Sequence, residues 1–440
     1  MENSLKIQIP NNNTNERLYA INSLVETILG ISAEIETLPN SEYTTIVFDN
    51  KKICIKDSFF NRFPQPLSYL AVENLPDPKY FFVEFSPENN TPILYGDDTF
   101  VVDTKYIECG IDLFAGAFFM LSRWEEYCVK DVDIHNRFIG KNSVAFKSGF
   151  INRPIVNEYA EILWNMLSHL GYKGSRKVAG FEYNLTHDID ILYSNSRLKS
   201  VAGDILKRRD IRMAISRLLP PYTDPVNTYD FLMTESEKLC QQSTFYLMAT
   251  DYKPDNNNGK GYLDSNKFTQ LVADIKSRKH KIGFHPSYGT CANADKWKKE
   301  KLMLEKAAQT YITLCRQHFL QISIPQTFRI LEDNNITSDS TLGYPDCEGF
   351  RCGTGSTFIL FDFINRRETS VCETPLIVMD TTIWAQHLPF EKITDIYNHY
   401  IAMGRKYNMP ITLLFHNSSF DNYRWKGWKQ LYSQIINTLK

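Results

Sequence analysis

The chain has 440 residues, of which 43% are hydrophobic and 23% are charged, as in ordinary globular proteins. This length predicts two or three domains, each large enough for its own core. The formal net charge is −2, so the chain as a whole offers no electrostatic footprint for nucleic acid, and we expect no such partner. Aromatic residues make up 13%, which fits sugar-binding clefts, although aromatic cores are the simpler interpretation.

The termini and the cysteines predict the compartment. The start of the chain, MENSLKIQIPNNNTNERL, lacks a basic stretch followed by an apolar run, and no segment is apolar enough to span a bilayer. The nine cysteines are an odd number and include no Cys-x-x-Cys pair. We therefore expect a cytoplasmic protein with free thiols, no zinc ribbon and no transmembrane segment.

The first part of the chain predicts a mixed α+β domain. Residues 43–55 (YTTIVFDNKKICI) predict a hairpin, with its turn at Asn50-Lys51-Lys52. The polar, glycine-bearing stretch 171–180 predicts a domain boundary, which gives an accessory domain over 1–175 and a second domain over 176–440. Helical patterns of the first domain cover 21–31, 112–127 and 156–170.

After the boundary, short apolar runs alternate with helical segments. This alternation predicts a parallel sheet or a barrel, in which catalytic residues collect at the C-terminal ends of the strands. Several of the runs end in Asp or His. The expected strands are 181–188, 243–250, 280–285, 356–362, 374–380 and 411–416, and the expected helices are 266–277, 297–316 and 392–407.

Two carboxylates close the first of these strands. Asp188 and Asp190 are two residues apart, so on extended backbone their side chains point to the same face. Two carboxylates on one face repel each other unless a cation or a shared proton lies between them. A metal ligand beside a general base meets that need. The alternative is a solvated acidic loop.

Three histidines are candidates for the same site. His285 and His416 each end an expected strand, and His318 follows Arg316 by two residues. Each is also a plausible plain polar residue when taken alone. A carboxylate with two or three imidazoles in one α/β unit nevertheless suits zinc or another divalent transition-metal ion.

Three motifs follow one another in the second part of the chain: Thr-His-Asp-Ile-Asp at 186–190, Ile-Gly-Phe-His-Pro-Ser at 282–287 and Leu-Leu-Phe-His at 413–416. Their order resembles the polysaccharide deacetylase family (carbohydrate esterase family four), and the resemblance covers about 178–440. The segment 339–344 (DSTLGY), followed by Gly349-Phe350-Arg351 and Gly353-Thr354, looks like a bacterial branch that carries an extra N-terminal domain. The segment 120–127 (MLSRWEEY) is similar to part of that domain.

This resemblance implies a fold and a chemistry. The fold is a distorted (β/α) barrel, here preceded by the α+β accessory domain, and the activity is metal-dependent removal of an acetyl group from a sugar. By matching positions, Asp188 is the general base, Arg316 orients it, and His416 is the general acid. The family's metal-binding aspartate is displaced by one residue, so Asp190 is its stand-in.

The expected metal site departs from the family pattern. His285 matches the first histidine of the family's His-x-x-x-His motif, but Gly289 occupies the position of the second. Either the site is weakened or another residue supplies the ligand, for which His318 is the candidate. We expect a divalent ion, zinc, bound by Asp190, His285 and His318.

Two further residues are candidates for substrate binding. Arg351 lies between Gly349 and Gly353, and turn-rich backbone around an arginine suits an anionic or hydroxyl-rich ligand. A structural ion pair with Asp339 or Asp362 is the equal alternative for Arg351. Tyr288, close after His285, is the second candidate.

The segment 197–217 (RLKSVAGDILKRRDIRMAISR) contains seven basic and two acidic residues. Apolar residues at 198, 201, 205, 213 and 218 predict a helical stripe. Such a helix can lie on an anionic membrane or bind a pyrophosphate-linked glycan. The alternative is an ordinary solvated helix without a partner.

The leading function is therefore removal of an acyl group from a carbohydrate substrate, in surface-glycan assembly. Two alternatives stay open. One is a catalytically inactive barrel that binds glycan as a module, which the missing second histidine favours. The other is a C–N hydrolase of a non-sugar amide, because one fold hosts several chemistries.

Overall fold

The structure is a computed structural model that describes residues 5–39, 41–177, 180–193, 201–209, 211–218, 224–250, 263–420 and 424–439. The chain forms two compact units, each built from three segments. Unit 1 comprises Met1–Tyr183, Phe319–Val378 and His399–Thr412, and unit 2 comprises Asn184–His318, Met379–Asn398 and Leu413–Lys440. The domain boundary expected within 171–180 stays a prediction.

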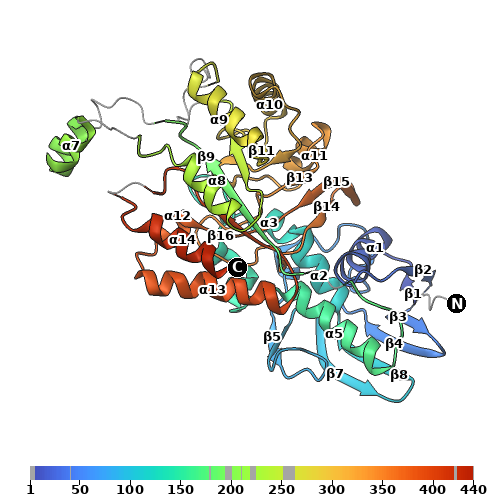
Figure 1. The fold of residues 1–440 in the computed structure, drawn as a ribbon. Coiled ribbons are helices and arrows are strands. Elements are labelled where there is room, and N and C mark those ends of the chain that lie inside the picture. Colours follow the sequence, from blue (N-terminus) through green and yellow to red (C-terminus); the bar gives the residue numbers. More distant parts are fainter. Residues whose placement is uncertain are drawn as a thin grey trace. The chain divides into compact units, whose positions relative to one another are not determined.

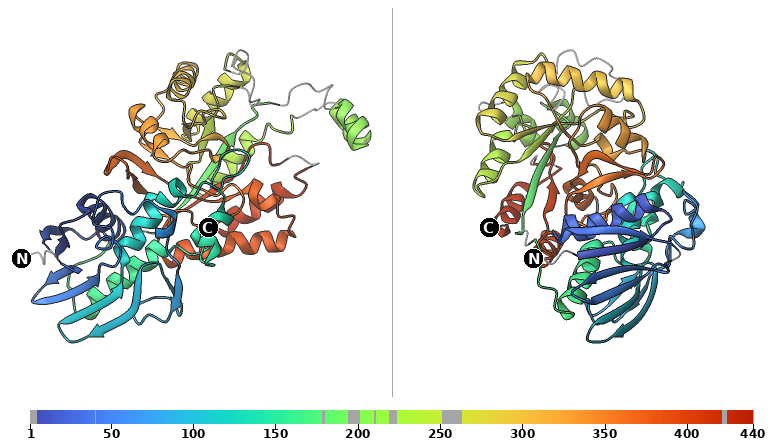
Figure 2. Two further views of the ribbon diagram at one scale, coloured as in Figure 1. Left: turned by 180° about the vertical axis from the view of Figure 1, so that it is seen from behind. Right: turned by 90° about the vertical axis from the view of Figure 1, so that its right-hand side faces the viewer.

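A six-stranded sheet lies in the N-terminal part of unit 1, in the order β2-β1-β3-β4-β8-β7 (Figure 2). It is mixed, because β1 pairs with β2 and β4 with β8 in parallel, whereas the other neighbours are antiparallel. A separate two-stranded sheet pairs β5 with β6. The strands are β1 Leu5–Pro10, β2 Ala33–Leu38, β3 Tyr43–Phe48, β4 Lys51–Lys56, β5 Lys79–Phe81, β6 Thr91–Ile93, β7 Gly96–Val102 and β8 Tyr106–Ile111.

The hairpin expected over 43–55 is confirmed as β3 and β4, which pair from Tyr43 and Lys56 to Phe48 and Lys51. Its turn is Asp49-Asn50, one residue earlier than expected, and both residues have positive φ angles of 44° and 58°. Two-residue hairpin turns favour this conformation, and Asp and Asn tolerate it better than lysine does.

The helices of this part are also close to the expected ones, with two corrections. The helix expected over 112–127 is broken at Arg123, whose φ of 55° ends one helix and begins the next. The pattern at 21–31 belongs to the end of an α-helix followed by a π-helical segment, η1. The bounds are α1 Thr14–Ile21, η1 Asn22–Ile28, η2 Val72–Asn74, α2 Leu113–Ser122, α3 Trp124–Cys128, η3 Gly140–Asn142, α4 Val144–Lys147 and α5 Ile155–His169.

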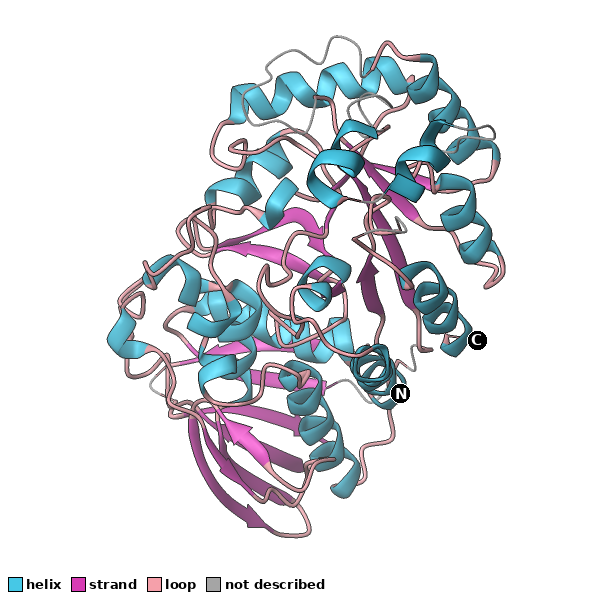
Figure 3. Cartoon of the chain, turned by 90° about the vertical axis from the view of Figure 1, so that its left-hand side faces the viewer, coloured by secondary structure: helices cyan, strands magenta, loops and turns pink. Residues whose placement is uncertain are grey.

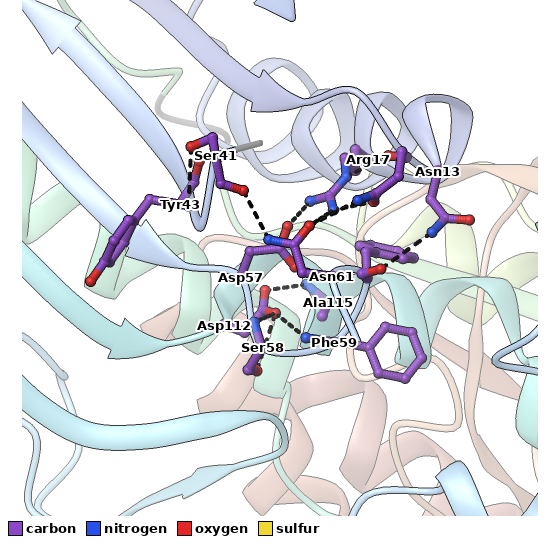
Figure 4. A network of polar contacts seen from close by, with 12 residues as sticks. Asn13, Arg17, Ser41, Tyr43, Asp57, Ser58, Phe59, Asn61, Asp112 and Ala115 are labelled. Carbon is purple, nitrogen blue, oxygen red and sulfur yellow. Dashed lines mark hydrogen bonds and ion pairs between the residues drawn. The ribbon is translucent and has the colours of Figure 1, made fainter. Parts of the chain in front are cut away.

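A buried polar network joins α1, α2 and the chain after β4 (Figure 4). Asp112 caps α2, because its Oδ1 accepts the Ala115 N–H at 3.0 Å. Its Oδ2 accepts the N–H groups of Ser58 and Phe59 at 2.9 and 3.1 Å. One carboxylate therefore satisfies three backbone donors, at a side chain that is 4% exposed.

Replacing Asp112 with alanine is expected to lower the free energy of unfolding by roughly 2–5 kcal/mol, because a cap is lost and two further buried N–H groups lose their acceptor. Urea denaturation measures the change. Exposed Asp98 in β7 is the matched control, and its alanine variant should stay near the wild type. Equal stability of the two variants would contradict the role given to Asp112.

The second sheet has nine strands in the order β14-β15-β13-β12-β11-β10-β9-β17-β16. The fold class is therefore confirmed in its coarse form, a mixed α/β protein with a curled, half-barrel sheet. All six expected strands are present, and three further strands, the two-residue strands β12 and β13 and the seven-residue strand β15, were not expected. The strands are β9 Tyr183–Ile189, β10 Thr244–Leu247, β11 Lys281–Phe284, β12 Leu314–Cys315, β13 Ser338–Asp339, β14 Phe358–Asp362, β15 Arg367–Glu373, β16 Leu376–Met379 and β17 Ile411–Leu414.

Within unit 2, strands β9 to β12 are parallel neighbours, with helices around them (Figure 3). Their register aligns Asp188 with Tyr246 of β10, and Phe284 of β11 with Cys315 of β12. The residues that follow these strands therefore emerge at one edge of the sheet, as expected for a parallel α/β unit.

The expected helix 297–316 is wrong over its second half. The observed helix α10 ends at Ala308, and Gln309 follows with a φ of 47°. The next residues, TYITLC, are rich in β-branched and aromatic types, which favour a strand over a helix. They lead into β12, so Arg316 follows a strand.

The helices after β9 (Figure 1) are η4 Asp204–Arg208, α7 Ile211–Leu218, α8 Tyr229–Glu237, α9 Asn266–Ser277, α10 Ala294–Ala308, η5 His318–Leu320, α11 Gln326–Asp333, α12 Asp380–Trp384, α13 Phe390–Lys406 and α14 Trp428–Thr438.

No helix in the described ranges is both long and apolar enough to cross a membrane. All nine cysteines lie in the described part of the chain, and no disulfide joins them. The cytoplasmic location stays a prediction.

Candidate functional site

Four of the expected site residues, Asp188, Asp190, His285 and Arg316, lie at the ends of strands in unit 2. Asp188 is the second-last residue of β9, and Asp190 is the first residue after that strand. His285 follows β11, and its N–H donates to the Leu247 carbonyl of β10 at 2.9 Å. Arg316 follows β12, with its N–H bonded to Phe284 at 3.0 Å. The sheet thus brings together residues that are up to 128 positions apart.

Asp190, His285 and His318 form a compact group of candidate metal ligands. Each offers one ligand atom, and these atoms all lie within 4.8 Å of one another. Asp190 Oδ1 is 3.3 Å from His285 Nε2 and 3.7 Å from His318 Nε2. Donors at about 2.1 Å from a tetrahedral zinc ion are separated by about 3.4 Å, so these separations fit such an ion.

The surroundings of the group also fit a cation. His285 Nδ1 is 2.6 Å from the carbonyl oxygen of Arg316. Because a carbonyl only accepts, Nδ1 carries a proton in this contact, and Nε2 is the ring atom that faces Asp190. Asp190 Oδ1 is buried and accepts no hydrogen bond from a described residue. A buried carboxylate oxygen beside the Nε2 atom of an imidazole suits a divalent cation.

Asp188 is held by Arg316 rather than by solvent. The Arg316 guanidinium donates to Asp188 Oδ1 at 3.0 Å and to the Thr186 hydroxyl at 2.8 Å. It also lies over the Tyr246 ring, 4.5 Å from the centroid. The Asp188 side chain is 3% exposed, so the solvated-loop alternative does not describe it.

His416 is held by a residue that sequence reasoning missed. Asp380 begins α12, and its Oδ1 is 2.7 Å from His416 Nδ1 while its Oδ2 accepts the His416 N–H at 2.7 Å. The Nε2 atom of His416 is 3.8 Å from Asp190 Oδ2. Asp380 ends the apolar run 374–380, and the same rule that singled out Asp188 would have found it.

Burial and neighbouring charge shift the pKa values of this cluster. Burial alone lowers the pKa of His416, but the Asp380 carboxylate outweighs it and raises that pKa to about 10. Burial raises the pKa of Asp190, yet the His318 imidazole and its neighbours hold it well below its usual value. Neighbouring charges therefore keep the His416 and Asp190 side chains ionised although burial opposes it, and such shifted pKa values are common at functional sites.

His187, beside the catalytic candidates, predicts a pH dependence of stability. Its Nδ1 lies 3.1 Å from the Phe415 carbonyl and its ring packs against Phe245. Burial lowers its pKa from 6.5 to about 3. The unfolded chain therefore binds this proton more tightly, so the stability that His187 contributes is complete above pH 6.5 and is lost as the pH falls toward 3.

We expect wild-type protein to lose about 2 kcal/mol more stability between pH 7.5 and pH 5 than a His187→Gln variant. The reason is that histidine at position 187 binds a proton in the unfolded state in this range, whereas glutamine does not titrate. Urea titrations across this range measure the difference. Parallel losses in the two proteins would show that His187 is not the group responsible.

Arg351 does not join the other site residues. Its side chain is 1% exposed and lies in unit 1, where its Nε donates to Glu126 at 2.8 Å and its Nη1 to the Gly343 carbonyl at 2.7 Å. This geometry favours the structural alternative, with Glu126 as partner in place of Asp339 or Asp362. Tyr288 is partly exposed in the loop after His285, and its substrate role stays a prediction.

A family model described as a family of unknown function (DUF7033) matches residues 5–172, which is less than half of the chain. No curated protein matches.

Among solved structures, the chain resembles a proposed polysaccharide deacetylase from Mycobacterium smegmatis, with 14% identity and a TM-score of 0.39, over 59% of this chain and 85% of that one. It also resembles the Bc1960 peptidoglycan N-acetylglucosamine deacetylase, with 14% identity and a TM-score of 0.32, over 60% and 83% of the two chains. BA3943 of Bacillus anthracis, a pseudoenzyme of the CE4 family, matches at 10% identity and a TM-score of 0.32, over 60% and 62%. Likenesses this weak carry no conclusion about function.

Proposed function

We propose that the protein is a metal-dependent deacetylase that removes an acyl group, such as acetyl, from a sugar or polysaccharide, in surface-glycan assembly. One observation carries the proposal. Three possible ligand atoms of Asp190, His285 and His318 meet within 4.8 Å, and a buried Asp–Arg pair and a partly buried His–Asp pair lie directly beside them.

A divalent ion, zinc in our proposal, held by these three side chains would act as a Lewis acid toward the acyl carbonyl and make water easier to deprotonate. The other residues supply the proton transfers. Asp188 accepts the proton of the attacking water, and the Arg316 guanidinium fixes its carboxylate and places positive charge beside it. His416 donates a proton from Nε2 to the departing amine or alkoxide, while Asp380 holds its Nδ1–H.

Gly289 favours one competing function, a catalytically inactive module that binds glycan. A histidine expected from the family pattern is absent there, and Gly289 has a φ of 77°, a conformation that a side chain rarely adopts. Against this alternative, His318 supplies a third possible ligand atom from another loop. A hydrolase of a non-sugar amide is the remaining alternative.

The test combines metal analysis with an assay of acetate release. Purified full-length protein is measured for bound metal by plasma mass spectrometry, then incubated with N-acetylated chitooligosaccharides before and after chelation. We expect bound divalent metal, and acetate release that chelation abolishes and zinc restores. Bound metal with no acetate release from any acetylated glycan would favour the non-sugar hydrolase, and glycan binding without metal would favour the inactive module.

Asp380 is proposed as a positioning residue for His416. Its replacement by asparagine keeps the size of the side chain but alters which protons the pair shares, so kcat should fall roughly ten- to hundredfold with KM nearly unchanged. Steady-state kinetics separate the two constants. A variant with wild-type kcat, or one that changes only KM, would remove Asp380 from this role. Asp395→Asn, an exposed position on α13, is the control.

We also propose that residues 1–175 form the accessory domain of this enzyme and that the protein acts in the cytoplasm. The match of a family model to 5–172 supports the first of these proposals.

A further inference from the structure

The segment 205–218 exposes an unusual amount of apolar surface. Ile205, Leu206, Ile211, Ile215 and Leu218 are 48%, 78%, 65%, 48% and 49% exposed. Of the 18 large hydrophobic residues exposed in the described part of the chain, these five fall within one stretch of 14 residues. Isolated exposed apolar residues are ordinary, but a concentration of this kind marks an interaction surface.

The apolar residues share one face of helix α7. Ile211, Ile215 and Leu218 have the spacing i, i+4 and i+7, which places them in one row along a helix. Ala214 lies beside this row and is buried. This stripe replaces the one expected from positions 198, 201, 205, 213 and 218, of which 198 and the side chain of 213 lie outside the described residues.

The charge of the segment indicates what covers this face. Residues 201–218 contain five Lys or Arg and two Asp, although the whole chain is nearly neutral. Asp204, one of the two acids, is fully buried. Exposed apolar side chains in a segment whose sequence is net positive form the pattern of a helix that lies in the headgroup region of an anionic bilayer.

We propose that the segment 205–218 binds the surface of an anionic lipid membrane, with Ile211, Ile215 and Leu218 facing the acyl chains, and that the positive charge of the segment attracts the headgroups. The segment lies within unit 2, which also contains the candidate metal site. Membrane binding would hold the enzyme where lipid-linked glycans are assembled. The inference does not depend on the deacetylase proposal, because vesicle binding needs no catalytic activity.

The test is co-sedimentation of the full-length protein with vesicles. One vesicle preparation contains phosphatidylcholine alone and the other contains phosphatidylcholine with phosphatidylglycerol. We expect binding to the second, weakened by high salt, and little binding to the first. I211S/I215S should lower the affinity for anionic vesicles about tenfold or more, because apolar burial is lost. R212Q/R217Q should also lower it about tenfold.

Matched controls use exposed residues elsewhere. I134S replaces an isoleucine that is 91% exposed in unit 1, and K298Q/K299Q removes two exposed charges from α10; both should bind as the wild type does. Circular dichroism checks that the variants remain folded. Equal binding to both kinds of vesicle, or unchanged binding of I211S/I215S, would overturn the proposal. So would a wild-type dimer that I211S/I215S converts to monomer without any vesicle binding, because the face would then join two copies.

Discussion

Replacing Asp188 with asparagine is expected to lower turnover about a hundredfold or more while the metal content stays near that of the wild type. Asparagine keeps the size and reach of the side chain but cannot accept the proton. The three proposed ligands, Asp190, His285 and His318, remain in place in this variant. Initial rates of acetate release at saturating substrate, with metal content measured on the same sample, give both quantities.

The outcomes of this experiment separate three interpretations of the Asp-x-Asp motif. Full activity with lost metal would mean that Asp188 is a ligand and that the two aspartates have exchanged roles. Full activity with full metal content would place the catalytic centre elsewhere and favour the glycan-binding module. Asp295→Asn, at an exposed position on α10, is the control for the same chemical change and should leave both quantities unchanged.

The sequence was informative about strand ends because a buried strand appears as an apolar run and a site residue appears as the polar residue that ends it. Asp188, His285 and His416 each follow a run of apolar residues, and parallel strands bring such ends to one edge of a sheet. That reasoning places the residues near one another but does not give their partners. The contact between Arg316 and Asp188 joins residues 128 positions apart, and no local pattern encodes it.

Arg316 shows where local reasoning failed. Helical periodicity placed it at the end of a long helix, whereas the run before it forms β12 by pairing in parallel with β11. Strand propensity depends on the neighbouring strand, so a two-residue strand has almost no signal of its own. For Arg351 the sequence left two interpretations open, and the structure favours the structural ion pair. The glycine-rich surroundings of Arg351 looked like a ligand loop, but the carboxylate that satisfies it, Glu126, lies 225 positions earlier in the chain.

Removing a proposed metal ligand should produce the other large effect. Asp190→Ala and His285→Ala are each expected to lose nearly all bound metal, because a site with three protein ligands cannot hold the ion with two at ordinary concentrations. His318→Ala decides whether His318 takes the place left by Gly289. If it does, this variant also loses its metal; if metal stays at the wild-type level, His318 is a buried neighbour of a site completed by another group.

Thermal unfolding with and without added zinc provides a readout that is independent of activity. A ligand that binds only the folded state stabilises it by about 2.7 kcal/mol at a hundredfold excess over Kd, so zinc should raise the wild-type Tm. The three variants should melt near the metal-free wild type and show no such shift. His387→Ala, an exposed histidine in unit 2, is the control and should keep the full zinc response. A zinc response retained in Asp190→Ala and His285→Ala would show that the ion binds at other residues, and the proposed function would lose the observation that carries it.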